Sequence, residues 1–112
     1  ENNQKATFFC VGRIAADFHY VIRKISERGH EIGCHSNEHL WLTQMTPKQL
    51  QEDTKEAIDA LQDVSGQSVV SYRAPAFSIG EKNKWAIEMW YRERFFYLSG
   101  RERFWWFSSF PC

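Results

Sequence analysis

The chain has 112 residues, and its 14 Lys and Arg residues balance its 14 Asp and Glu residues, which gives a formal net charge of 0. This length fits one domain, and the balanced charge gives no reason to expect a nucleic acid or an anionic membrane as a partner. No apolar run in the sequence reaches the length of a membrane-spanning helix, so the chain itself is expected to carry no such span.

The first third of the sequence predicts two strands joined by a helix. Residues 6–11 are a short apolar run of β-forming residues without alternation, which predicts a strand buried on both faces. From residue 13 to residue 28 apolar side chains recur every three or four positions, which predicts an amphipathic helix that ends at Gly29. A second strand is expected at 31–34. Tight connections of this kind predict a βαβ unit with parallel strands.

Cys10 and Cys34 fall in these apolar segments, where buried thiols are the expected state.

A second helix and a third strand follow. Thr46 and Gln49 flank Pro47 in the pattern of a capping box, and the apolar stripe that follows continues to Ser65 and Gly66. A third strand is expected at 68–72 and a further helix from 82 to about 94. Parallel sheets bind ligands at the carboxyl ends of their strands, so the residues after 34 and 72 are the candidates for a site.

His35 and His39 are the candidate metal ligands. Four residues separate them, which would place both imidazoles on one face of a helical turn. Each neutral imidazole offers a lone pair to a divalent cation, but a catalytic zinc usually has three protein ligands and a water molecule. On this spacing alone, ordinary surface or core histidines remain the commoner explanation.

The composition changes after residue 89. Residues 90–112 contain ten of the 18 aromatic residues and four of the eight arginines, and apolar periodicity is lost. A binding patch for nucleic acid or a membrane surface is one interpretation. A poorly packed terminal segment, or a translation in the wrong reading frame, is favoured over it. The sequence is therefore divided into a partial domain at 1–89 and an atypical aromatic and arginine-rich tail at 90–112.

Four ordered segments resemble the polysaccharide deacetylases (carbohydrate esterase family 4, the NodB-like homology domain). They are Ala-Thr-Phe-Phe at 6–9, Gly-His-Glu-Ile-Gly at 29–33, His-Ser-x-x-His at 35–39 and Arg-x-Pro at 73–75. The resemblance covers roughly residues 5–89 and implies an α/β fold, a fragment of a distorted (β/α) barrel with parallel strands. It implies a metal-dependent hydrolase that removes N-acetyl groups from amino-sugar polymers. An N-acetylated polysaccharide or oligosaccharide would be its substrate, and its location would be extracytoplasmic or at the cell envelope.

The resemblance also assigns roles to individual residues. His35 and His39 would hold a divalent metal, with zinc expected, and Ser36 would support their loop by bonding a nearby backbone group. Arg73 would orient the catalytic base, and the backbone N–H of Ala76 would stabilise the oxyanion. The expected lining of the sugar groove is Pro75, Phe77 and Trp41.

Two departures from the family pattern matter. The family's Asp-Asp motif, which supplies the base and the third metal ligand, is expected upstream of residue 6, and no Asp-Asp occurs in the chain. The acid histidine of the family lies downstream, yet no His follows His39. The chain is therefore expected to be an incomplete and inactive deacetylase. The alternatives are a non-catalytic module that binds carbohydrate or metal, and an unrelated doubly wound α/β domain with incidental histidines.

Overall fold

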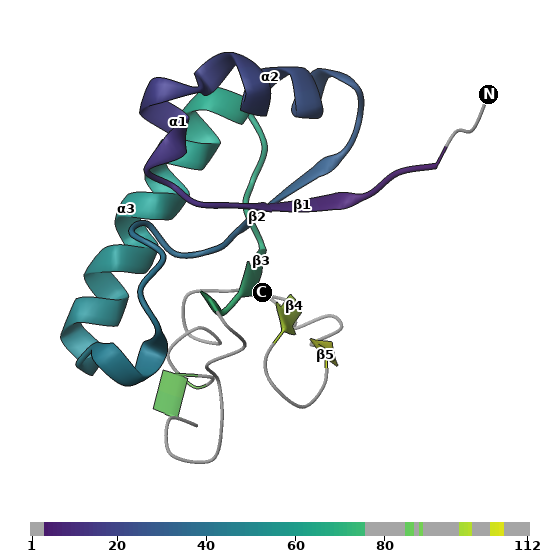
Figure 1. Ribbon diagram of the computed structural model, residues 1–112. Helices are drawn as coiled ribbons and strands as arrows, with labels where there is room; N and C mark the ends of the chain where they lie inside the picture. Colours follow the sequence, from purple (N-terminus) through teal and green to yellow (C-terminus); the bar gives the residue numbers. More distant parts are fainter. Residues whose placement is uncertain (1–3, 76–84, 87, 89–96, 100–103, 107–112) are drawn as a thin grey trace.

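The computed structural model describes residues 4–75, 85–86, 88, 97–99 and 104–106. A five-stranded sheet in the order β1-β2-β3-β4-β5 organises these residues, with helices packed against it (Figure 1). The elements are β1 (Thr7–Cys10), α1 (Ile14–Asp17), α2 (His19–Glu27), β2 (Glu31–Cys34), η1 (Leu42–Gln44, a 3-10 turn), α3 (Pro47–Ser65), β3 (Ser71–Arg73), β4 (Tyr97–Ser99) and β5 (Phe104–Trp106).

Strands β1 to β4 run parallel and β5 is antiparallel to β4. Cys10 lies opposite Cys34, and Cys34 lies opposite Tyr72, so the first three strands end at the same edge of the sheet. The predicted βαβ unit is thus present, with parallel strands. It places the residues after β2 and the end of β3 beside each other.

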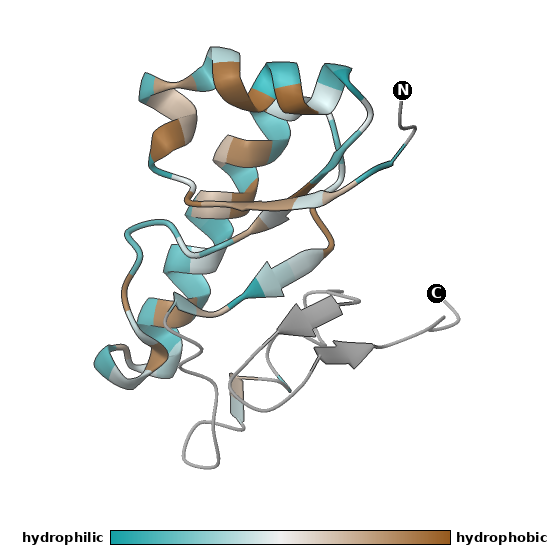
Figure 2. Ribbon diagram, turned by 45° about the vertical axis from the view of Figure 1, so that its right-hand side comes forward, coloured by the Kyte–Doolittle hydropathy of each residue, from teal (hydrophilic) through white to brown (hydrophobic). Residues whose placement is uncertain are grey.

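The hydrophobic core lies between the sheet and the helices. Ile32, Cys34 and Tyr72 of the sheet are fully buried, as are Ile22 of α2 and Leu61 of α3. Figure 2 shows apolar segments along β1 and on the helices beside it. The predicted buried state of Cys10 and Cys34 is confirmed, and both are free thiols.

On the opposite face of the sheet the strands approach closely at Gly33. A Cβ atom at this position would lie 2.6 Å from Ser71 Oγ and 2.7 Å from a ring carbon of Phe9. Contacts this short do not occur for real Cβ atoms, so a side chain at this position would force Ser71 or Phe9 to shift. The second glycine of the Gly-His-Glu-Ile-Gly segment therefore has a steric reason.

Helix α3 follows its sequence signals closely. The Thr46 hydroxyl accepts from the Gln49 N–H at 3.2 Å, and Gln49 Oε1 accepts from the Thr46 N–H at 2.9 Å, which completes the predicted capping box. Gly66 ends the helix with φ 75°, in the left-handed conformation. The predicted helix ends are therefore confirmed.

The prediction of a single helix in the first third of the chain is wrong. The expected helix at 13–28 is two helices that break at Phe18, where φ is −127° and ψ is 40°. Both parts pack on α3, and α2 also packs on β2, while Ala15 of α1 is buried. Phe18, one of the apolar side chains in the predicted periodic pattern, is 48% exposed.

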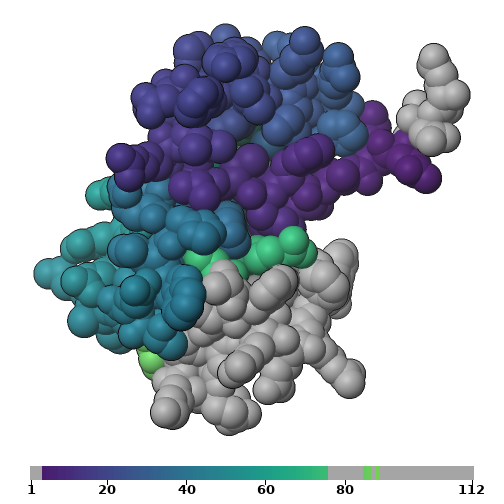
Figure 3. Space-filling model, in the orientation of Figure 1, coloured from purple at the N-terminus to yellow at the C-terminus, as the bar shows by residue number. Residues whose placement is uncertain are grey.

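Strand β1 is not buried on both faces as predicted. Thr7 and Phe8 are exposed, and Figure 3 shows this strand (purple) at the surface of the molecule. The reason is its place at the edge of the described sheet, where only β2 pairs with it. The third strand is also shorter than expected, since it begins at Ser71.

None of the helices in the described ranges is long and apolar enough to cross a membrane. The helix expected from 82 to about 94 and most of the tail from residue 90 fall outside the described residues. Within that tail the structure places the short strands β4 and β5.

Candidate metal centre

His35 and His39 come together at the carboxyl end of β2. The His35 N–H donates to the Cys10 carbonyl at 2.9 Å, which continues the parallel ladder by one residue beyond the strand. The chain then turns sharply, with φ 69° at Ser36 and φ 59° at His39. The two imidazole rings are neighbours in an edge-to-face arrangement, with centroids 5.0 Å apart and planes at 65°. Both rings therefore border one point in space.

A backbone carbonyl of the neighbouring strand anchors the His35 ring. His35 Nδ1 lies 2.6 Å from the carbonyl oxygen of Arg73. A carbonyl only accepts, so Nδ1 carries the proton and Nε2 keeps its lone pair. A metal-ligating histidine usually has its second nitrogen fixed in this way, with the orientation and tautomer set by the partner.

The surroundings of His35 also favour its neutral form. Burial lowers the pKa of the half-buried His35, and the positive charges of His39 and Arg73 lower it further, against the opposing effect of the carbonyl bond. A neutral imidazole is the form that coordinates metal. The lowered pKa of His35 thus favours the form that a cation requires.

The donor set at this point fits a divalent metal in part. Two imidazoles suit zinc and other borderline metals. Over the described residues no group of three or more His, Cys, Asp or Glu side chains is placed to hold a metal. The described part of the chain therefore offers two candidate ligands, one fewer than the three that a catalytic zinc usually has.

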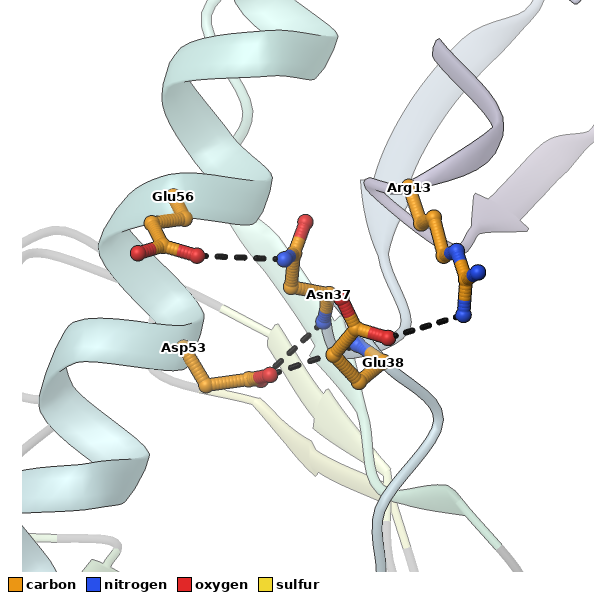
Figure 4. A network of polar contacts seen from close by, with 5 residues as sticks. All are labelled: Arg13, Asn37, Glu38, Asp53 and Glu56. Atoms are coloured by element: carbon orange, nitrogen blue, oxygen red, sulfur yellow. Dashed lines mark hydrogen bonds and ion pairs between the residues drawn. The ribbon is translucent and has the colours of Figure 1, made fainter. Parts of the chain in front are cut away.

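Asp53 of α3 holds the loop between the two histidines (Figure 4). Its Oδ2 accepts from the Ser36 hydroxyl at 2.8 Å and from the Asn37 N–H at 3.0 Å. Its Oδ1 accepts from the Glu38 N–H at 3.3 Å. Asp53 is 9% exposed and Ser36 is fully buried, so these bonds form where little water competes.

This finding corrects the role expected for Ser36, because its hydroxyl donates to a carboxylate rather than to a backbone group. It also identifies Asp53 as a residue of the candidate site that sequence reasoning missed. The signal was an acidic residue within the apolar stripe of α3, one position before the buried Thr54. Charged residues are rarely buried unless they have partners, so an Asp on that stripe indicates a nearby set of donors.

The turn after β1 braces the same loop from the other side. The Gly12 N–H donates to the Ser36 carbonyl at 2.9 Å, and the Arg13 N–H donates to the Asn37 carbonyl at 3.2 Å. Exposed side chains add an ion pair at 3.1 Å between Arg13 and Glu38, which contributes little because both are in water. The loop is thus held through its backbone on two sides.

Arg73 lies at the same end of the sheet as His35, as expected for parallel strands. Its guanidinium carbon is 4.2 Å from the centroid of the Phe9 ring, a cation–π contact with β1. Pro75 is fully buried, and Trp41 is 49% exposed close to His39. Ala76 and Phe77 lie outside the described residues, and the roles expected for these five residues stay predictions.

The Cys34 thiol lies directly before the histidine loop, but it is buried in the core and is not a candidate metal ligand. Burial, aided by the nearby charge of Asp53 and opposed by a bond to the Ser36 backbone, raises the pKa of Cys34 to about 12. Burial also raises the pKa of Tyr72 well above its usual value. Both groups stay protonated at neutral pH and belong to the core.

Comparison with known proteins identifies the family. The family model for polysaccharide deacetylases matches residues 1–90. The peptidoglycan-N-acetylglucosamine deacetylase of Bacillus cereus is 30% identical over 89 residues, which cover 79% of this chain and 32% of that protein. The chain therefore spans about a third of the length of this curated relative.

Two solved structures resemble the described fold. The Bc1960 peptidoglycan N-acetylglucosamine deacetylase gives a TM-score of 0.70 at 30% identity, over 78% of this chain and 41% of that chain. A family 4 acetyl xylan esterase from Clostridium thermocellum, in complex with a cobalt ion, gives a TM-score of 0.61 at 31% identity. The match covers 66% of this chain and 37% of that chain. The βα units described above match part of the (β/α) barrel of these enzymes. This chain belongs to the polysaccharide deacetylase family.

Proposed function

We propose that the chain carries the two-histidine half of the metal centre of a carbohydrate de-N-acetylase. The observation that carries this proposal is the pairing of His35 and His39, with ring centroids 5.0 Å apart and the first ring anchored on the Arg73 carbonyl. Zinc is the metal we expect, and the cobalt ion in the xylan esterase supports a divalent cation at such a site. The substrate would be an N-acetylated polysaccharide or oligosaccharide.

Each residue has a defined part in this proposal. A bound divalent ion lowers the pKa of water and polarises an acyl carbonyl. His35 and His39 would hold that ion through one ring nitrogen each. The Arg73 carbonyl keeps His35 in the right tautomer, and the Arg73 guanidinium, steadied on Phe9, would orient a carboxylate base. Trp41, exposed near His39, would stack on a sugar ring.

The chain is proposed to be inactive unless further groups complete the site. Hydrolysis of an amide needs a base for the water and an acid for the leaving amine. The described residues place no carboxylate with the two imidazoles, and no His follows His39 in the sequence. Because one missing group commonly costs ~10²–10⁴-fold in rate, the loss of two would abolish measurable turnover. We further propose an extracytoplasmic or envelope location, where such glycans occur.

The test measures acetate released from N-acetylglucosamine oligomers with added Zn²⁺. The 112-residue chain is compared with a chain extended through the flanking coding sequence and with its His39→Ala variant. The proposal predicts release only from the extended chain, abolished by a chelator and by the substitution. Robust metal-dependent release by the 112 residues alone would refute the assignment of missing groups. Oligomer binding without release by the extended chain would favour the alternative, a non-catalytic carbohydrate-binding module.

A further inference from the structure

We infer that Asp53 is the positioning residue of the histidine pair: its carboxylate sets the distance between His35 and His39. This inference rests on the proposed function and extends it to a residue outside the ligand set. Asp53 lies on α3, eighteen residues after His35 in the sequence, and its hydrogen bonds go to Ser36, Asn37 and Glu38 rather than to either ring. It acts on the chain between them.

Three donors converge on one buried carboxylate. The Ser36 hydroxyl and the Asn37 N–H share Oδ2, and the Glu38 N–H uses Oδ1. These three residues are consecutive and link the two histidines. Hydrogen bonds to an ionised acceptor are stronger than neutral ones, and burial strengthens them further. The carboxylate therefore fixes every residue between the two ligands.

The backbone of this loop needs such support. Ser36 and His39 both have positive φ angles, 69° and 59°, in a region that non-glycine residues seldom occupy. Strained conformations of this kind persist only where the surroundings over-determine them, and they cluster at functional sites. Without Asp53 the loop would relax, and the ring of His39, which is exposed, would move away from that of His35.

Glu56, one turn further along α3, provides a matched control. Its carboxylate accepts from the Asn37 side-chain amide at 3.2 Å and is exposed. It therefore shares a helix, a charge and a contact residue with Asp53, but among the described residues it holds none of the loop's backbone N–H groups (Figure 4).

The decisive variant is Asp53→Asn, which keeps the shape of the side chain. An amide has one acceptor oxygen and one donor nitrogen in place of two acceptors. Whichever way it is turned, its N–H₂ faces a backbone N–H of the loop. We expect Zn²⁺ affinity of the 112-residue chain to fall ~10–100-fold, the range for groups that orient metal ligands. Glu56→Gln should stay within ~2-fold, and Asp53→Glu should recover part of the loss because the carboxylate returns.

Affinity is measured at a temperature where circular dichroism shows each variant folded, so that a merely structural role does not mimic the effect. A folded Asp53→Asn chain with wild-type Zn²⁺ affinity would overturn the inference. If that variant does not fold, Ser36→Ala removes one of the three donors and keeps the carboxylate. It should lower Zn²⁺ affinity by a smaller factor, and an unchanged affinity would equally overturn the inference.

A metal-free readout separates this inference from the proposed function. In NMR spectra without metal, Asp53→Asn should speed amide exchange at Asn37 and Glu38 and split or broaden the ring signals of His35 and His39. Unchanged exchange and single sharp ring signals would refute the role of Asp53. Wild-type protein that fails to bind Zn²⁺, with the ring signals still responding to Asp53→Asn, would refute the metal site alone.

Discussion

Replacing Gly12 by Ala tests how closely the β1–α1 turn approaches α3 beneath the histidine loop. A Cβ atom at Gly12 would lie 2.5 Å from Ala57 Cα, 2.7 Å from Ala57 Cβ and 2.7 Å from Asn37 Oδ1. Two of these atoms belong to the helix backbone or are bonded directly to it, so no side-chain rotation relieves the clash. The turn and α3 must separate, or Asn37 must move.

The expected cost follows from the contacts. Overpacking a core by one methyl group typically costs ~1–3 kcal/mol, and the rigid neighbours place Gly12→Ala toward the upper end of that range. At roughly 4–6 °C per kcal/mol for a chain of this size, a cost of ~2–3 kcal/mol lowers Tm by roughly 8–18 °C. The loss of ~2–3 kcal/mol is a large part of the ~5–15 kcal/mol by which a folded domain is usually stable.

Gly66→Ala is the matched control. Gly66 has φ 75°, so alanine is strained there, but nothing lies within 4 Å of its Cβ position. The replacement should cost about 1 kcal/mol through the backbone alone. Both variants are unfolded in urea and followed by circular dichroism. Gly12→Ala should also shift the NMR amide signals of Asn37, whereas Gly66→Ala should not. A Gly12→Ala chain as stable as wild type would show that the turn does not pack against α3 as described.

Three further predictions concern the core and the helix cap. Above pH 9 the chain should lose stability: the pKa of Cys34 is raised from 9.0 to about 12 in the folded state, so the stability that its burial gives is full below pH 9 and is lost as pH rises toward 12. Urea unfolding at pH 8 and pH 10.5 measures this, and equal stability at both would contradict it. Thr46→Ala should cost ~0.5–2 kcal/mol because Thr46 caps α3, while the exposed Thr43→Ala should be near neutral by thermal unfolding. Leu61→Ala should cost ~2–5 kcal/mol in the same assay, because Leu61 is fully buried.

Local signals in the sequence predicted much of the fold. The caps of α3 and the bounds of β2 could be predicted because each depends on a few neighbouring residues. The parallel strands followed from their connections. The break at Phe18 could not be predicted, since the apolar periodicity runs through it and the packing of both helices on α3, and of α2 on β2, is tertiary.

The candidate site could likewise be predicted only in part from the sequence. His35, His39 and Arg73 lie in short motifs at strand ends, so their sequence positions were enough to group them. The contribution of Asp53 depends on α3 packing beside a loop fifteen to seventeen residues earlier. An Asp on the apolar stripe indicates nearby donors, but no local pattern shows which loop supplies them. The bond from His35 to the Arg73 carbonyl likewise depends on the pairing of β2 with β3.

The central claim is that His35 and His39 form a metal-binding pair, and the four histidines of the chain allow a direct measurement. The ring nitrogens are followed by NMR while Zn²⁺ is added to the 112-residue chain. We predict that the signals of His35 and His39 shift together, with the change at Nε2 of His35 because its Nδ1 is bound to Arg73. His19 and His30, which lie on and after α2, should not respond. No shift at His35 and His39, or equal shifts at all four histidines, would contradict the claim.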